Sequence, residues 1–389
     1  MAKLPKADWT QREDLARLVT ALGTDNMRWV GGAVRDTLLG VPVRDVDAAT
    51  TLRPEDVMKH LKDKGIKPIP TGLDHGTITA LLPEGNVEVT TLRKDVATDG
   101  RRATVAFAEQ WEDDAARRDF TINALYAHPE TLEISDYFGG LADLDARRVR
   151  FIGDAHDRIR EDHLRILRYY RFQARFGAEL DETAEAACEE LASTLKGLSR
   201  ERVAMELLAI LALPDPYATV ARMQAKGVLP VVLPEAGDAG LGRFADLLEH
   251  ERQQGAAPSS IRRLAALLPP DRKTAEQVAA RLRLSNAQRK HLARLAQRSN
   301  FLEGPRALAY REGMELARDL LLLSGLPLEQ VEDWQPPVFP LKGGEIVARG
   351  VAAGPEVARL LQTVETRWIA EGFPDAERVA QLLDETLSR

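Results

Sequence analysis

The chain has 389 residues, of which 44% are hydrophobic, and a formal net charge of −7. Length and apolar content predict a globular protein of two to four domains, and the negative charge argues against a protein that coats nucleic acid by bulk electrostatics, although a local basic surface can still bind it. Its single cysteine, Cys188, excludes intrachain disulfides and cysteine-based zinc clusters, and it fits a small buried residue in a reducing, cytoplasmic location.

The first predicted element is an amphipathic helix with apolar residues at helical intervals from Leu15 to Leu22. Thr10 and Glu13 stand at capping-box spacing and predict its start. No signal peptide is expected, and the later apolar run Leu320–Leu323 is far shorter than the roughly 20 residues that a bilayer span needs. A membrane role is therefore not expected.

The segment from Arg28 to Tyr137 mixes helical patterns with short alternating ones. Turn residues such as Pro83-Glu84-Gly85-Asn86 separate the alternating stretches. We predict strands at Val43–Ala48, Thr77–Leu82 and Asn86–Leu92.

Beyond Asp154 the strand signals nearly vanish, and long amphipathic segments rich in Leu, Ala, Arg and Glu predict helices. The sequence therefore predicts an α+β fold in which a mixed sheet is followed by an all-helical region. The predicted parts are a head at 1–137, a helical neck at 138–215, and a helical body and tail at 216–389.

Two aspartates follow a glycine pair in Gly31-Gly32-Ala33-Val34-Arg35-Asp36 and Arg44-Asp45-Val46-Asp47. On one strand Asp45 and Asp47 would project from the same face, where two carboxylates repel each other unless a cation lies between them. Mg²⁺ prefers such oxygen ligands and completes its shell with substrate phosphates, which the backbone at Gly32 and the charge of Arg35 could also hold. The pattern favours phosphoryl transfer; an isolated Asp-x-Asp is more often a solvated strand.

A third carboxylate, Glu88, lies in the predicted strand Asn86–Leu92 on the face opposite Val87 and Val89. Together with Asp45 and Asp47 it would suit two-metal catalysis, in which one ion activates a 3′-hydroxyl and the other stabilises the leaving pyrophosphate. The alternative for Glu88 alone is an exposed strand residue.

These motifs and the run Arg117-Arg118-Asp119-Phe120-Thr121-Ile122-Asn123-Ala124-Leu125 resemble the class II CCA-adding enzymes, tRNA nucleotidyltransferases related to bacterial poly(A) polymerases within the polymerase-β-like superfamily. The stretch Glu161–Phe172 is similar to the family's nucleotide-selecting E-D-x-x-R motif. The similarity continues through Arg200-Glu201-Arg202 to Phe339–Phe373, and so covers nearly the whole chain. It implies a polymerase-β-like head and template-independent addition and repair of the tRNA 3′-CCA from CTP and ATP.

Asp162 and Arg165 are three residues apart, so on one helix they would share a face. Because a guanidinium donates and a carboxylate accepts, the pair could form Watson–Crick-like hydrogen bonds with C or A without a template. The resemblance implies that this pair contacts the base while Arg118, Arg168 and Arg171 hold the nucleotide. The alternative is a surface helix whose charge pairs only aid solubility.

Two further segments carry expectations. Lys94–Trp111 is polar and predicts a flexible loop, which resembles the family loop associated with the switch from C to A addition; an ordinary surface loop is the alternative. Asp119 before Phe120–Leu125 is also typical of a helix start, where an acidic residue favours the N-terminal dipole. His156-Asp157 has no matching partners for a phosphohydrolase site.

The resemblance implies that the helical part holds the acceptor and T arm of tRNA through backbone shape and phosphates, which suits a protein that accepts every tRNA. No obligate protein partner is expected. A poly(A) polymerase is the enzymatic alternative, but Thr71–Thr77 stands where bacterial poly(A) polymerases carry an Arg-Arg-Phe segment. A non-catalytic RNA-binding protein on the same scaffold is the other alternative.

Overall fold

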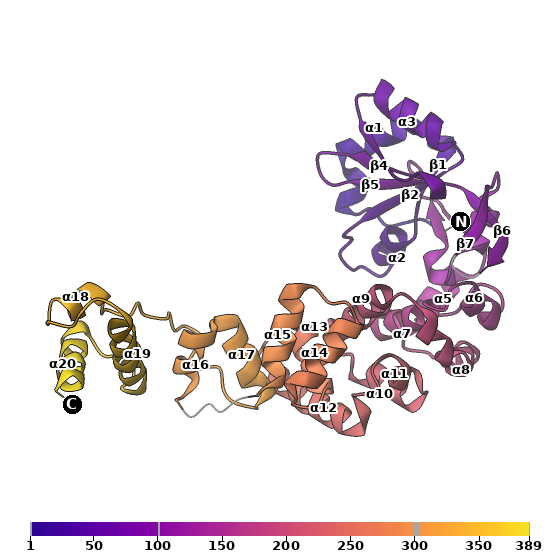
Figure 1. Ribbon diagram of the computed structural model, residues 1–389. Helices are drawn as coiled ribbons and strands as arrows, with labels where there is room; N and C mark the ends of the chain where they lie inside the picture. The colour runs from indigo at the N-terminus through magenta and orange to yellow at the C-terminus, as the bar shows by residue number, and fades with distance from the viewer. Residues whose placement is uncertain (1, 100–101, 299–302, 389) are drawn as a thin grey trace. The chain divides into compact units, whose positions relative to one another are not determined.

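The computed structural model describes residues 2–99, 102–298 and 303–388 (Figure 1). The chain forms two compact units, Met1–Val232 and Leu233–Arg389. All strands of the described residues lie in the first unit, and helices make up the second. The predicted α+β fold, with a mixed sheet before an all-helical region, is confirmed.

The sheet has seven strands in the order β3-β4-β5-β2-β1-β8-β9. Strands β2 and β5 pair in parallel, and every other neighbouring pair is antiparallel. Its strands are β1 (Met27–Val30), β2 (Val46–Thr50), β3 (Lys67–Gly72), β4 (Thr77–Leu81), β5 (Val87–Thr91), β8 (Leu125–Ala127) and β9 (Ile134–Asp136).

A separate hairpin and a series of helices complete the first unit (Figure 1). The hairpin consists of β6 (Arg93–Asp99) and β7 (Arg102–Phe107). The helices are α1 (Glu13–Leu22), α2 (Gly32–Leu38), α3 (Pro54–Asp63), α4 (Trp111–Ala116), α5 (Gly140–Asp145), α6 (Ala155–Glu161), α7 (Arg165–Phe176), α8 (Glu182–Glu190), α9 (Arg200–Leu211), α10 (Tyr217–Ala225) and α11 (Val228–Val232).

One face of the sheet receives the N-terminal segment. The Trp9 indole packs edge-on against Trp29 of β1, with ring centroids 5.7 Å apart, and donates to the Thr37 hydroxyl at 2.9 Å. This anchoring holds Asp8–Gln11 in a 3₁₀ turn of its own, so α1 begins only at Glu13. The predicted helix is confirmed, but the predicted cap is wrong, because the Thr10 hydroxyl bonds to Ala7 instead.

The opposite face carries a compact apolar cluster that ties β1, β2 and β8 to α4. Side chains alternate between the faces of a strand, so Val30 and Ala49 project from this face while Trp29 projects from the other. The buried members of the cluster are Val30, Ala49, Leu92, Ala108, Ala115, Ala124, Tyr126 and Ile152. The candidate site lies on this same face.

Strands β4 and β5 confirm the predictions for Thr77–Leu82 and Asn86–Leu92. Strand β2 begins three residues later than the predicted Val43–Ala48, because its pairing with β5 starts at Val46 opposite Val87.

Two loop and helix predictions are wrong. Most of the predicted loop Lys94–Trp111 forms the β6–β7 hairpin, since its Val and Thr residues are β-branched and favour strands. Gly100 and Arg101 of that segment lie outside the described residues. After Asp119 the chain makes only the 3₁₀ turn Thr121–Asn123 and then enters β8.

The second unit ends in a tail core built around Trp368, whose indole donates to the Pro374 carbonyl at 2.7 Å. None of the helices within the described ranges is long and apolar enough to cross a membrane. The helices of the unit are α12 (Gly237–Gln253), α13 (Ser260–Leu267), α14 (Arg272–Arg281), α15 (Asn286–Ala296), α16 (Pro305–Glu312), α17 (Met314–Leu323), α18 (Gly343–Val347), α19 (Pro355–Ala370) and α20 (Ala376–Leu387).

Candidate active site

A row of directly paired residues crosses four adjacent strands. Glu88 on β5 pairs with Asp47 on β2, Asp47 pairs with Val30 on β1, and Val30 pairs with Tyr126 on β8. Residues paired directly across strands project from the same face of a sheet. The structure therefore brings Asp47, which is half-buried, beside the exposed Glu88.

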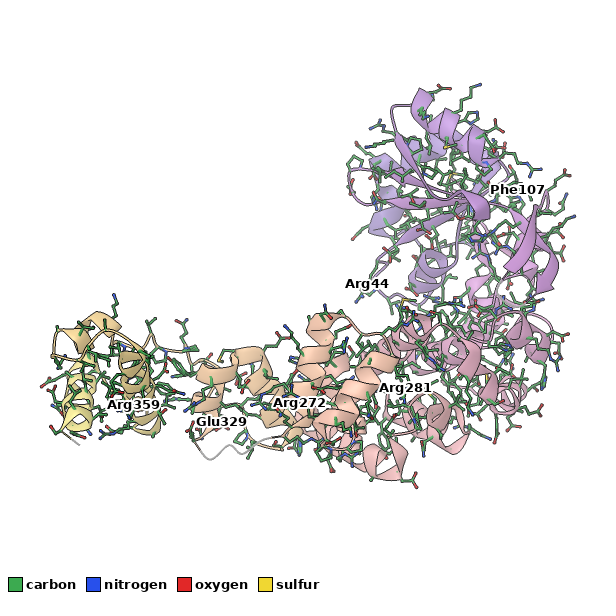
Figure 2. All side chains as sticks on the ribbon, viewed as in Figure 1. Arg44, Phe107, Arg272, Arg281, Glu329 and Arg359 are labelled. Atoms are coloured by element: carbon green, nitrogen blue, oxygen red, sulfur yellow. The ribbon has the colours of Figure 1, made fainter. Side chains whose placement is uncertain are left out.

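Asp45 lies in the loop before β2, next to Arg44, which projects from that loop (Figure 2). The prediction that Asp45 lies within the strand is therefore wrong, but Asp45 directly precedes β2 and its charge interacts with that of Asp47. Burial and then the charge of Glu88 raise the pKa of Asp47 to about 6; Arg118 opposes the rise and Asp45 adds to it. Negative charge at Asp47 is thus incompletely neutralised within the protein.

The donor set fits a divalent metal ion. Carboxylate oxygens are the ligands that hard divalent ions prefer, and a bound cation would relieve the repulsion that raises the pKa of Asp47. The carboxylates of Asp45 and Glu88 make no hydrogen bond or ion pair with described residues, which leaves their oxygens available. No group of three His, Cys, Asp or Glu side chains in the described part of the chain is already gathered around a common point.

The glycine pair forms a sharp turn between β1 and α2. Gly31 has a φ of +70°, in the left-handed region that favours glycine, and α2 begins at Gly32. A Cβ atom on Gly31 would lie 3.6 Å from Nη1 of Arg118, so this guanidinium faces the turn. The turn therefore brings open backbone and a positive charge to the end of β1, beside the pairing partner of Asp47.

Arg35 is buried, with 4% of the residue exposed. Its guanidinium donates to Asp36 at 2.6 Å and to the side-chain oxygen of Asn123 at 2.5 Å, and it stacks over Phe176 at 4.4 Å. The structure thus places Arg35 in a buried network that joins α2 to α7.

Arg118 is held by two residues that the sequence reasoning missed. It donates from Nη2 to Asp114 at 3.1 Å and from Nε to the Tyr126 hydroxyl at 2.9 Å. Asp114 lies in α4, three and four residues before Arg117 and Arg118, and this spacing was a usable signal. Tyr126 gave none, because its place depends on the pairing of β8 with β1.

The selector residues stand at a break between helices. Asp162 has an extended conformation after α6, and its carboxylate accepts from the Leu164 amide at 3.1 Å. The prediction that Asp162 and Arg165 share one helix face is wrong, because α7 begins only at Arg165. The Asp162 side chain is 31% exposed and pairs with Arg202 at 2.6 Å.

Arg165 is the first residue of α7, and only 13% of its side chain is exposed. It pairs with Glu161 and donates to the Arg158 carbonyl at 2.7 Å. Asp162 therefore offers the more open group of the two.

Arg168 and Arg171 follow along α7, and each meets a buried carboxylate. Arg168 donates to Asp119 at 2.5 and 2.8 Å, and Arg171 donates to Glu206 at 2.6 Å. Burial alone would raise the pKa of Asp119, but Arg168 and further hydrogen bonds outweigh it and lower the pKa. Asp119 therefore joins the head motif to α7 and does not cap a helix.

The structure also shows the surroundings of His156 and Cys188. His156 pairs with Glu190 at 2.9 Å, which accounts for this histidine without a phosphohydrolase site. Cys188 is fully buried, as predicted, and burial raises the pKa of its thiol well above the ordinary value.

Comparisons with known proteins place the chain in a family. A family model described as the Poly A polymerase head domain matches residues 27–150, and one described as a probable RNA and SrmB-binding site of polymerase A matches 177–239. The mouse mitochondrial CCA tRNA nucleotidyltransferase 1 is 37% identical over 386 residues, covering 93% of this chain and 87% of the mouse protein. Its human counterpart is 36% identical over 372 residues, covering 89% and 83%.

The Bacillus stearothermophilus CCA-adding enzyme, solved in complex with CTP, has a TM-score of 0.74 and 26% identity, covering 97% of this chain and 98% of that one. Head, carboxylate row and family matches define this chain as an enzyme of the nucleotidyltransferase class with a poly(A)-polymerase-type head. More narrowly, the chain belongs to the CCA tRNA nucleotidyltransferase family, as its motifs predicted.

Proposed function

We propose that this protein adds and repairs the 3′-terminal CCA of tRNA without a template, using CTP and ATP. The tRNA 3′-hydroxyl attacks the α-phosphate of the nucleotide, and pyrophosphate leaves. The observation that carries the proposal is the pairing of Asp47 with Glu88 beside the Gly31 turn and Arg118, in a chain that belongs to this family along nearly its whole length. The same relatives favour CCA addition over a poly(A) polymerase.

Each site residue has a proposed task. Asp45 and Asp47 would hold Mg²⁺, with Glu88 assisting, and the ion when bound would supply charge stabilisation for the phosphates and the hydroxyl. The Gly32 backbone and Arg118 hold the triphosphate, and Arg35 supports the turn from within. These tasks follow from donor type and position.

The proposed selector combines Asp162 and Arg165 at the start of α7, with Arg168 and Arg171 farther along the helix. Asp162 accepts from the base edge and Arg165 donates to it, so the two nucleotides are read by the protein. In the structure Arg202 holds the Asp162 carboxylate, and a base must share or replace that contact. The proposed parts remain a head at 1–137, a neck at 138–215, and a body and tail at 216–389.

A basic groove on α14 and α15 is the proposed contact for the tRNA backbone. Arg272 lies on α14 (Figure 2), and the groove is lined by Arg272, Glu276, Asn286, Arg289, Lys290 and Arg294. Replacing both Arg289 and Lys290 with alanine should weaken tRNA binding. The slope of log affinity against log salt concentration should fall in magnitude by roughly 1 to 2, because fewer phosphate contacts mean that fewer counterions are released on binding. Filter binding from 50 to 300 mM salt measures this slope.

The matched control is the pair Lys59→Ala and Lys62→Ala, which removes two exposed lysines from α3. It should leave the slope close to that of the wild type. An unchanged slope in the Arg289 and Lys290 variant would rule out this groove as a phosphate contact.

Metal binding should depend on pH through Asp47. The pKa of this carboxyl is about 6 in the folded chain, so it is largely protonated at pH 5 and ionised at pH 7.5. We expect Mg²⁺ to raise the melting temperature more at pH 7.5, with Asp47→Asn showing the same small rise at both. Without metal, stability has the opposite dependence on pH. Because the pKa of Asp47 is higher in the folded chain than in the unfolded chain, the free energy of unfolding falls as pH rises from 3.8 to about 6. An equal Mg²⁺ effect at both pH values would contradict the assignment.

The deciding experiment incubates the purified protein and Mg²⁺ with tRNA transcripts that end before CCA, after C and after CC. CTP, ATP or both are supplied, and the 3′ ends are sequenced. Addition that stops at CCA is expected. A long A tail without C would instead establish a poly(A) polymerase, and no addition to any transcript would favour a non-catalytic RNA-binding protein.

The place of action is proposed from composition. A lone buried cysteine suits a reducing compartment such as the cytoplasm. The vertebrate relatives named above are mitochondrial proteins, so fractionation of the source cells is the test.

A further inference from the structure

Three side chains behind the candidate site form a closed triangle of hydrogen bonds. Arg118 donates from Nε to the Tyr126 hydroxyl at 2.9 Å and from Nη2 to Oδ2 of Asp114 at 3.1 Å. The Tyr126 hydroxyl completes the triangle by donating to the same Oδ2 at 2.7 Å. Two of the three guanidinium nitrogens of Arg118 are therefore fixed by neighbours from two elements, α4 and β8.

The anchor of the triangle is strongly held. Asp114 is 1% exposed, and its Oδ1 accepts from Nε of Arg117 at 2.8 Å and from the Arg93 amide at 3.2 Å. Burial would raise the pKa of Asp114, but Arg118 and Arg117 outweigh it and lower the pKa to about 2. Asp114 is thus ionised over the working pH range and faces donors on both oxygens.

The third nitrogen of Arg118 is the one that remains. Nη1 makes no hydrogen bond with any residue that the structure describes, and it lies 3.6 Å from the position of a Cβ on Gly31. The charge of Arg118 also acts on Asp47 and opposes the rise of its pKa. The triangle therefore leaves Nη1 as the one guanidinium nitrogen of Arg118 without a partner among the described residues, and this nitrogen lies beside the glycine turn.

We propose that Tyr126, itself fixed by Asp114, is a positioning residue whose hydroxyl sets Arg118 so that Nη1 meets the nucleotide phosphates. This inference rests on the proposed function, because it assigns the ligand of Nη1 as a nucleoside triphosphate. Tyr126 lies in the same cross-strand row as Asp47, so the hydroxyl that positions Arg118 and the proposed metal ligand belong to one face of the same sheet. The hydroxyl acts through Arg118 and touches no substrate.

The alternative is that the triangle only stabilises the head. Tyr126 is fully buried and its ring packs edge-on against Trp111 at 5.9 Å, so the ring has a structural task of its own. Tyr126→Phe keeps the ring and removes only the hydroxyl. A loose Arg118 then samples other rotamers, and the nucleotide must restore its order on binding.

The test is a double-mutant cycle on kcat/KM for CTP and on CTP affinity by calorimetry. Tyr126→Phe should lower kcat/KM about tenfold, mainly through KM, and weaken CTP binding by a similar factor. In an Arg118→Lys background the same change should alter both quantities less than twofold, because the group through which it acts has gone. Tyr170→Phe is the matched control, since Tyr170 is also fully buried and its hydroxyl has no partner among the described residues.

Equal losses from Tyr126→Phe in both backgrounds would mean that the hydroxyl is merely structural. Unchanged kcat/KM and CTP affinity in Tyr126→Phe would also overturn the inference. A wild-type chain that binds CTP but adds nothing to any transcript would sink the proposed function, and the binding cycle would still decide on Tyr126. Addition of CCA by the wild type with no effect of Tyr126→Phe would sink the positioning role alone.

Discussion

Asp47→Asn should lower CCA addition by at least about 10³-fold, while tRNA affinity stays within twofold of the wild type. Asparagine keeps the shape of the side chain but removes the charge that a divalent ion requires, and a lost metal contact of this kind costs on the order of 4 kcal/mol in the transition state. Asp47 is half-buried and its negative charge is unfavourable in the folded chain, so a neutral side chain of the same shape should be tolerated and the variant should fold. Single-turnover incorporation of CTP measures the loss.

Asp63→Asn is the control for this change, since Asp63 is exposed at the end of α3 and makes no ion pair among the described residues. It should incorporate CTP like the wild type. If Asp47→Asn retained turnover within tenfold of the wild type, Asp47 would not be a metal ligand.

Asp162→Ala should reduce discrimination among the four nucleoside triphosphates by roughly 10- to 100-fold, the range that one good pair of base contacts provides. Arg165→Ala should do the same or abolish addition, because its guanidinium is also tied to Glu161 and the Arg158 carbonyl. The measurement is kcat/KM for each nucleotide on a transcript that ends before CCA.

Asp157→Ala provides the matched control on α6. It breaks an exposed pair with Arg160 at 2.9 Å and should leave nucleotide choice unchanged, because exposed pairs of this kind contribute little. A purely structural Asp162 would behave differently from a selector. Asp162→Ala and Arg202→Ala would then lower the melting temperature alike, and the preference for C and A would persist in both.

Local pattern was enough to predict the class of fold and two strands. The alternation in Thr77–Leu82 and Asn86–Leu92 indicates which side chains are buried, and the burial of alternate side chains stabilises both strands. The register of pairing is different information. Because the pairing with β5 begins at Val46, β2 starts there, and Asp45 lies in a loop although the sequence alone predicted it in a strand.

The helical break at Asp162 shows a second limit of local reasoning. Charged residues at helical spacing across Glu161–Phe172 predict one continuous helix, yet the Asp162 carboxylate bonds to the Leu164 amide and starts a new one. Whether such a polar side chain interrupts a helix depends on a small difference in free energy between the continuous and the broken helix. The partners of Asp162 in space, chiefly Arg202 from α9, contribute to that balance and are invisible in the local sequence.

The order of strands also determines when the site can exist during synthesis. The Asp47 strand pairs with β5, whose residues emerge later, and the row is completed only when β8 joins β1 on the other side. Such long-range pairing is slow to form, because the chain loses loop entropy before the contacts compensate for it. A nascent chain in which Tyr126 has not yet been synthesised therefore contains Asp45 and Asp47 but lacks the hydroxyl that positions Arg118. Competence for nucleotide binding should thus appear only after the head and the selector residues at the start of α7 have all been synthesised.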